Sequence, residues 1–222
     1  MSYRRYEDRR EAGRLLAEAV AERRFADPVV LGLPRGGLVV AAEVAARLGA
    51  PLDIVLVRKL GAPYQPELAV GAVIDGGEPE LVLNEDVVRA TDASPDYIRK
   101  ETARQVAVIE ERRRLWLADR PRAPIAGRTA IVVDDGIATG ATVRAALRWL
   151  KRRHPKAVVI ATPVAAEETV EALKAEADEV VCLQSPVSLG AIGFFYRDFR
   201  QIADDEVTAI LREAAPKDVG PA

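Results

Sequence analysis

The feature that most constrains the fold of this chain is the segment 130–142, where an apolar, β-branched run ends in two adjacent carboxylates, Asp134 and Asp135. Small and hydroxyl residues follow the two acids and lead into a helix-forming segment, 143–152. This order predicts a buried parallel strand, a short loop and a helix. The carboxylates would then lie at the strand end where open α/β sheets bind their ligands. The first N–H groups of the helix would favour an anion at the same place.

Two carboxylates beside an anion-binding loop suit a ligand that carries both hydroxyl groups and a phosphate, such as a phosphorylated ribose. The loop positions that permit close approach or add hydroxyl donors are Gly136, Ala138, Thr139, Gly140, Ala141 and Thr142. The competing interpretation is an ordinary strand-to-helix turn capped by an aspartate. Capping alone, however, requires neither a second acid nor the rest of the loop. The segment also lacks the Gly-Lys-Ser/Thr of a Walker loop and the glycine spacing of a dinucleotide fold.

These residues resemble the phosphoribosyl pyrophosphate (PRPP) signature of the type I phosphoribosyltransferases, in which two acids precede a Thr-Gly-x-Thr loop. The resemblance implies that Asp134 and Asp135 hold the ribose hydroxyls and, through these and water, Mg²⁺. It assigns the 5′-phosphate to Ala138, Thr139, Gly140, Ala141 and Thr142. It also implies the fold class, which is a Rossmann-like α/β core with a parallel sheet, helices on both faces, a lid hairpin and a small C-terminal hood.

The alternation of apolar runs with helical segments independently predicts a parallel sheet covered on both faces. Strands are expected at 28–33, 52–57, 130–133, 157–162 and 178–183, and helices at 8–24, 36–48, 84–89, 94–117, 143–152, 166–176 and 204–213. Residues 59–68 are expected to interrupt the pattern, and 68–74 and 80–83 to form a hairpin around Asp75-Gly76-Gly77. We expect one domain, 1–222, with its core at 25–183, the lid at 60–80, an extra helix at 94–117 and the hood at 184–200.

A second candidate anion loop follows the first expected strand and comprises Pro34, Arg35, Gly36 and Gly37. Alone, such a turn is more typical of an ordinary surface loop. Beside the first loop it would match a ligand with a phosphate at each end, and the resemblance assigns it to pyrophosphate. Family members often have a cis peptide here. Because an X–Pro bond adopts cis at the lowest cost, we predict one between Leu33 and Pro34.

Arg58 and Lys59 end the next expected strand, where two cations would balance the charge of departing pyrophosphate. Without the other motifs they would equally fit a solvated pair. Adenine phosphoribosyltransferases have Arg-Lys in a similar place. Hypoxanthine–guanine members of the family have an aspartate that acts as a base where this chain has Ala138. The candidate base is therefore Glu67 in the lid. The competing interpretation of Glu67 is an ordinary surface carboxylate. In the hood, Phe194, Phe195 and Tyr196 would stack on a planar acceptor or simply close the edge of the core.

Composition limits the partners. The formal net charge of −2 offers no basic surplus for nucleic acid. One cysteine, Cys182, excludes an internal disulfide and fits a reducing compartment. The N-terminal segment carries no apolar signal-peptide core, and no apolar run approaches the length of a membrane span. We therefore expect a cytoplasmic protein without membrane or nucleic-acid partners.

The resemblance implies a Mg²⁺-dependent transferase of nucleotide salvage that moves phosphoribose from PRPP to a nitrogenous acceptor, a nucleobase above all, and releases pyrophosphate. It also implies a homodimer. The alternative is a regulatory module that senses PRPP without turnover. A phosphatase is a remote third interpretation, because the sequence has no His/Asp metal cluster.

Overall fold

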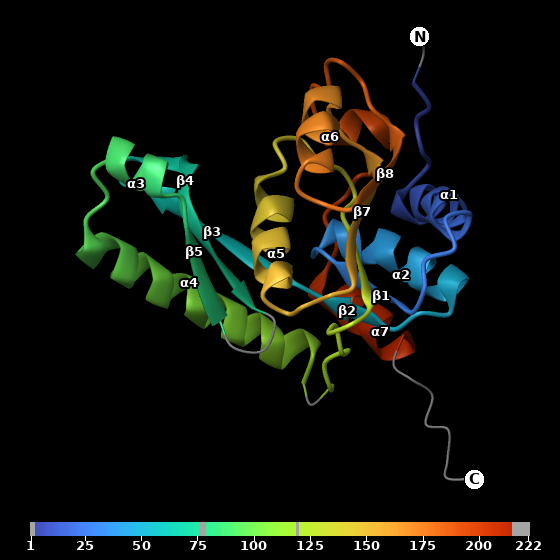
Figure 1. Ribbon diagram of the computed structural model, residues 1–222, viewed down its shortest axis with the longest axis horizontal. Helices are drawn as coiled ribbons and strands as arrows, with labels where there is room; N and C mark the ends of the chain where they lie inside the picture. Colours follow the sequence, from blue (N-terminus) through green and yellow to red (C-terminus); the bar gives the residue numbers. More distant parts are fainter. Residues whose placement is uncertain (1–2, 76–78, 119, 215–222) are drawn as a thin grey trace.

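The computed structural model describes residues 3–75, 79–118 and 120–214 (Figure 1). Its central sheet has five parallel strands in the order β2-β1-β6-β7-β8. Their bounds are Pro28–Gly32 for β1, Leu52–Ile54 for β2, Thr129–Val133 for β6, Ala157–Val164 for β7 and Glu179–Gln184 for β8. The predicted parallel sheet of an α/β fold is thus confirmed.

Helices cover both faces of this sheet because successive strand residues point to opposite sides and both sides are apolar. In β1, Val30 packs in the cluster formed with α1 (Arg9–Ala21), α2 (Gly36–Leu48) and α7 (Asp204–Glu213). Its neighbours Val29 and Leu31 pack in the opposite cluster, with α5 (Ala141–Lys151) and α6 (Glu167–Lys174). The predicted helices on both faces are therefore confirmed, with bounds that differ from those expected by no more than three residues.

A second, antiparallel sheet stands beside the first, in the order β3-β4-β5 (Figure 1). Its strands are β3 (Leu56–Ala62), β4 (Gln65–Asp75) and β5 (Pro79–Leu83), followed by α3 (Glu85–Ala90) and α4 (Pro95–Trp116). One face of this sheet meets α4 and the other meets α5, so α5 lies between the two sheets. The predicted β4–β5 hairpin and long helix are confirmed, and Gly76 and Gly77 of the hairpin turn lie outside the described residues.

Two expectations for this region are wrong. The strand predicted at 52–57 breaks at Val55, where the chain passes from the first sheet to the second. The segment 59–68, expected to be irregular, belongs largely to β3 and β4. The glycine and proline residues that predicted a break are accommodated within the hairpin. Pro63 lies in the short turn between β3 and β4, and the pairing register shifts around Gly61.

The strand order creates a topological switch point beside β1. The chain passes from β1 through α2 to β2 on one side, whereas β6 lies on the other side of β1 and continues through α5 to β7. The loops that follow β1 and β6 therefore leave the carboxyl edge of the sheet side by side. At such a switch point, open α/β proteins bind ligands in the crevice outside the strand ends. None of the described helices is both long and apolar enough to cross a bilayer.

Candidate active site

The two predicted anion loops meet at this switch point. The Leu33 N–H donates to the Val133 carbonyl at 2.9 Å, which joins the ends of β1 and β6. A Cβ at position 36 would lie 1.9 Å from Oδ2 of Asp135, and a Cβ at position 37 would lie 2.8 Å from Cα of Asp134. Only glycine fits at such separations, so Gly36 and Gly37 allow the loop to lie directly against the acid pair.

The cis peptide of this loop lies between Pro34 and Arg35, so the prediction of a cis bond between Leu33 and Pro34 is wrong. That prediction weighed only the intrinsic cost of each bond and could not include how the loop packs against Asp134 and Asp135.

Asp135 is held by side chains far away in the sequence. Its Oδ2 accepts a hydrogen bond of 2.6 Å from Nε of Arg9, and both side chains are about nine-tenths buried. Its backbone carbonyl accepts a hydrogen bond of 2.5 Å from the Tyr196 hydroxyl. Arg9 in turn donates from Nη1 to the Arg200 carbonyl at 2.9 Å, and its guanidinium carbon lies 4.0 Å from the centre of the Phe199 ring. Helix α1 and the hood therefore both fix this carboxylate.

Sequence reasoning missed Arg9, although a signal for it existed. The buried residues of α1 are Arg9, Ala12, Gly13, Leu16, Ala17 and Val20. Arg9 thus occupies the first position of the apolar stripe, three residues before Ala12. A guanidinium at such a position needs an acidic or carbonyl partner in the interior.

Asp134 differs from its neighbour. Its Oδ1 accepts a hydrogen bond of 2.9 Å from the Asp135 N–H. Burial and, next in size, the adjacent Asp135 carboxylate raise the pKa of Asp134 well above its usual range. One arginine against two buried carboxylates leaves a surplus of negative charge once both are ionised.

A surplus of this kind fits a divalent cation. The described residues contain no group of three or more His, Cys, Asp or Glu side chains that could hold a metal ion alone. Two carboxylates that share Mg²⁺ with the oxygens of a phosphorylated ligand are, however, a common arrangement for this ion. The donor set at Asp134 and Asp135 therefore fits magnesium brought with a substrate.

The loop 138–142 is braced from behind. Arg144 donates from Nη1 to the Thr139 carbonyl at 2.7 Å, and Thr169 donates from Oγ1 to the Ala138 carbonyl at 2.6 Å. Gly140 has φ of 73° and caps α5, a conformation that favours glycine. With these carbonyls engaged and Ala138 and Thr139 exposed, the first N–H groups of α5 remain the natural partners for an anion.

The hood closes over the other side of the loop. A Cβ at Gly136 would lie 2.4 Å from Cγ2 of Ile192 in the 3₁₀ turn η1 (Ile192–Phe195). Of the three aromatic residues predicted to bind the acceptor, Phe195 and Tyr196 are buried with Tyr6 and pack as core. Phe194 is 72% exposed and is the only one of the three that can reach a ligand without unfolding the hood.

Arg35 does not point at the acid pair. Its Nη1 donates to the Ile202 carbonyl at 2.9 Å, and its Nη2 lies 3.1 Å from Oδ1 of Asp204. Its guanidinium also lies 5.7 Å from the ring centre of Trp116 in α4. The side chain thus ties the loop to α7 and α4, and the loop presents its backbone and glycines to the crevice.

The structure separates the three predicted catalytic side chains. Arg58 and Lys59 are consecutive in β3 and project from opposite faces of the second sheet. Nε of Arg58 donates to Oε1 of the buried Gln105 in α4 at 2.9 Å, whereas Lys59 lies on the face that meets α5. Glu67 is exposed near the start of β4. The sequence prediction ended the strand at residue 57. It therefore did not include the alternation of side chains in β3 that places Arg58 and Lys59 on opposite faces.

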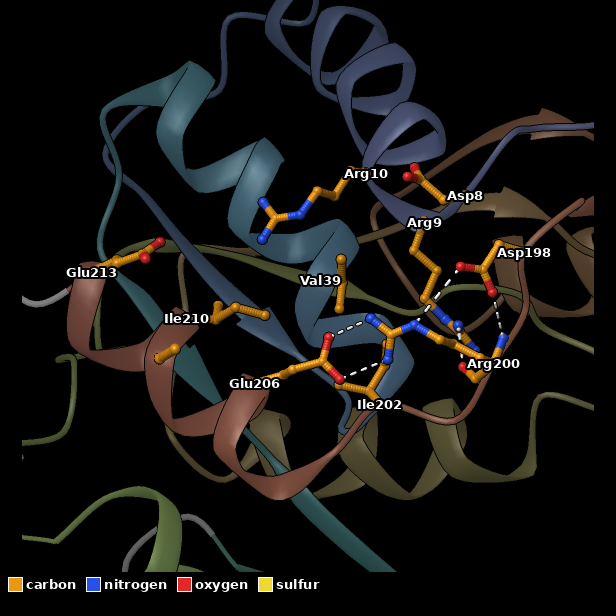
Figure 2. Close-up of a pocket in the computed structure, with 11 residues that line it drawn as sticks. Asp8, Arg9, Arg10, Val39, Asp198, Arg200, Ile202, Glu206, Ile210 and Glu213 are labelled. Atoms are coloured by element: carbon orange, nitrogen blue, oxygen red, sulfur yellow. Dashed lines mark hydrogen bonds and ion pairs between the residues drawn. The ribbon is translucent and has the colours of Figure 1, made fainter.

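In a hollow beside Arg9, charged side chains of the lining pair with one another. Figure 2 shows Arg9, Arg10 and Arg200 around this hollow between α1, α2 and α7. Arg200 donates to both carboxylate oxygens of Glu206, at 2.7 and 2.6 Å, and this pairing lowers the pKa of Glu206 to about 2. The hollow therefore supports the Arg9 side of the site and offers a ligand little unpaired charge.

Comparisons with known proteins show the family of this chain. Residues 2–197 match the family described as "Phosphoribosyl transferase domain". The protein named "Putative phosphoribosyl transferase Rv0571c" of Mycobacterium tuberculosis is 46% identical over 209 residues, which is 94% of this chain and 47% of the relative. A crystal structure, that of TT1426 from Thermus thermophilus, is 51% identical, covers 95% of this chain and 99% of its own, and has a TM-score of 0.80.

The fold and the acid pair beside two candidate anion loops are those of an α/β protein of the phosphoribosyltransferase class. The chain belongs to the phosphoribosyltransferase family of enzymes. It spans about half the length of the curated relatives it matches. An adenine phosphoribosyltransferase of M. tuberculosis is 32% identical over 138 residues, 62% of this chain and 47% of the relative.

Proposed function

We propose that the protein transfers the 5-phosphoribosyl group of PRPP to a nitrogenous acceptor, a nucleobase above all, and releases pyrophosphate. The observation that carries this proposal is the contact of Gly36 and Gly37 with Asp135 and Asp134. It brings a glycine-containing backbone loop, two carboxylates suited to ribose hydroxyls and the N-terminus of α5 to one edge of the sheet. A ligand with hydroxyls between two phosphate groups matches these three features in that order.

Each part of the site has a distinct task in the proposed reaction. The acceptor nitrogen forms a bond to C1′ while the bond from C1′ to the pyrophosphate oxygen breaks. The departing pyrophosphate takes the electron pair of that bond, and the acceptor gives up its N–H proton to a base. Asp134 and Asp135 would orient the ribose through its hydroxyls, while residues 138–142 would hold the 5′-phosphate. The backbone of residues 34–37 would receive the pyrophosphate. Mg²⁺ shared between the acids and the substrate would neutralise charge on the leaving group.

The second sheet would supply the lid of this reaction. Lys59 would approach the phosphates when the sheet moves toward the crevice, and Arg58 would hold the sheet on α4 through Gln105. Glu67 is the proposed acceptor of the proton, and Phe194 is the aromatic residue placed to stack on a planar acceptor. A homodimer and a place in cytoplasmic nucleotide salvage complete the proposal, because the family resemblance implies them.

The test is pyrophosphate release from PRPP and Mg²⁺ across a panel of purines, pyrimidines and small nitrogen heterocycles. We expect release that depends on one acceptor and disappears in an Asp134→Asn/Asp135→Asn double variant. Binding of PRPP without release with any acceptor would favour the sensing module instead. Absence of PRPP binding to the folded wild-type protein would refute both.

A further inference from the structure

A groove outside the crevice is lined by residues of α5 and of the second sheet. These elements lie side by side in Figure 1. Its charged and polar lining comes from Lys59 of β3, Asn84 before α3, and Arg144 and Arg148 of α5. The rest of the lining is apolar or small, including Gly71, Ala72 and Ala141. Small residues leave the three cationic side chains accessible from solvent, so the groove is open to a ligand rather than filled by side chains.

The charge of this groove is unbalanced. No acidic residue is found among the described residues that line it. Arg144 pairs with Glu176 at 2.7 Å. In the described part of the chain, neither Lys59 nor Arg148 forms an ion pair with a carboxylate. By contrast, Arg152 and Arg153, farther along the same stretch of chain, both pair with Glu80 of β5, at 3.0 and 2.7 Å.

We propose that this groove binds an oligophosphate, in the form of free inorganic phosphates linked in a chain or the phosphate tail of a nucleotide, at a site separate from the 5′-phosphate loop. Two unpaired cations that face one groove repel each other unless an anion lies between them. Guanidinium groups match phosphate oxygens with two parallel hydrogen bonds, and a lysine adds a point charge. Several linked phosphates can contact Lys59 and Arg148 at once, which a single carboxylate cannot.

The proposed site is distinct from the PRPP loop although it begins next to it. Ala141, the first residue of α5, belongs to both. Arg148 lies seven residues farther along the helix, about 10 Å at 1.5 Å per residue. An oligophosphate held there would connect the second sheet to α5 and would thereby restrict movement of the lid. The groove is thus placed to regulate the proposed reaction, but its occupation does not require that reaction.

The experiment is a calorimetric titration of the whole chain with inorganic triphosphate, repeated with ATP, at low salt and at about 0.15 M ionic strength. The variants are Arg148→Ala and, as the matched control, Lys151→Ala, which removes an exposed cation from the same helix outside the groove. Both positions are exposed, so both variants should keep the unfolding midpoint of wild type.

We expect Arg148→Ala to weaken triphosphate binding about tenfold, the loss of a charge-assisted hydrogen bond, and Lys151→Ala to change it less than twofold. Equal affinity for triphosphate and ATP would assign the site to free oligophosphate, and tighter binding of ATP would assign it to a nucleotide tail. Equal losses in the two variants, or no triphosphate binding to wild type, would overturn the proposal. PRPP binding should be unchanged by Arg148→Ala, so a failure here is separable from a failure of the proposed transferase activity.

Discussion

At the scale of single residues, the two carboxylates of the acid pair lie in different environments. Asp135 forms an ion pair with an arginine, whereas Asp134 forms none of comparable strength. Asp135 has the buried guanidinium of Arg9 at 2.6 Å, whereas Asp134 is buried beside a like charge. Ionisation of Asp134 therefore costs folding free energy, which a ligand or cation bound there would recover. A site that is strained in the free protein in this way is expected where binding matters more than stability.

Asp134→Asn should stabilise the free protein near neutral pH. The folded-state pKa of Asp134 is raised, so its contribution to stability is complete below the unfolded value of about 3.9 and is lost as pH rises through the folded value. Asparagine cannot ionise and can still accept from the Asp135 N–H. We expect a gain of about 1 kcal/mol, or ~2–4 °C in Tm, at pH 7, shrinking toward zero near pH 4. Thermal unfolding between these pH values, without ligand, measures it.

Asp135→Asn is the matched opposite. It removes the partner of Arg9 and leaves a buried guanidinium without its counter-charge, which should cost about 3 kcal/mol at pH 7. Equal effects of the two substitutions would contradict the assignment of different environments to the two carboxylates.

Gly36→Ala should disrupt the crevice without removing any functional group. The new Cβ would lie 1.9 Å from Oδ2 of Asp135 and 2.6 Å from Nε of Arg9, so the ion pair must shift. We expect a loss of about 2–3 kcal/mol in unfolding free energy and at least tenfold weaker PRPP binding. Denaturant unfolding and a PRPP titration measure the two effects. Wild-type values in both would contradict the close approach of Gly36 to Asp135.

At the scale of elements, Arg122 fastens the second sheet to the first. Its Nη1 lies 3.2 Å from Asp53 in β2, and its Nη2 lies 3.1 Å from Asp75 at the end of β4. The Asp75 side chain is fully buried. Arg113 of α4 also pairs with Asp75, at 3.3 Å. The buried carboxylates of the two sheets thus share Arg122, which follows α4, and Asp75 has a second counter-charge in Arg113 of α4.

Arg122→Gln should therefore destabilise the chain by about 3 kcal/mol, because two buried carboxylates lose a counter-charge at once. The exposed Arg148→Gln, which removes the same group from a helix surface, should cost no more than about 0.5 kcal/mol. Urea unfolding of both variants makes the comparison. Similar small losses would mean that the junction between the sheets does not depend on this arginine.

The elements that sequence reasoning found are those whose signals are local. Apolar β-branched runs marked the strands of the parallel sheet, and Ser94-Pro95 together with Asp96 marked the start of α4. What it missed depends on partners distant in the chain. The opposite orientation of Arg58 and Lys59 follows only once 56–62 is known to be a strand, and the ion pair of Arg9 with Asp135 spans most of the chain. The burial of Tyr196 likewise depends on Tyr6.

At the scale of the whole molecule, the proposed reaction needs the second sheet to approach the crevice from where it now stands. That sheet is attached to the central one at Val55 and at Arg122. Its helix α4 is attached to α7 by the hydrogen bond from Trp116 Nε1 to Asp204 at 2.9 Å. Lys59 and Glu67 lie farther along β3 and β4, beyond these attachments. Rotation of the second sheet about these attachments would also have to break its packing on α5 and the ion pairs of Arg152 and Arg153 with Glu80 of β5.

PRPP with Mg²⁺ should stabilise the whole chain by linkage, because a ligand that binds only the folded state adds about 2.7 kcal/mol at a hundred times its Kd. For a chain of this size we expect Tm to rise by ~5–10 °C. Chelation of Mg²⁺ with EDTA should remove most of the rise, because the surplus charge of Asp134 and Asp135 would then face the anionic ligand uncompensated. Differential scanning fluorimetry with and without EDTA measures the effect, and the Asp134→Asn/Asp135→Asn double variant, compared with its own unliganded Tm, is the control. A full shift in that double variant would place PRPP elsewhere on the protein, and a shift that survives EDTA would show that the acid pair binds the sugar without a metal.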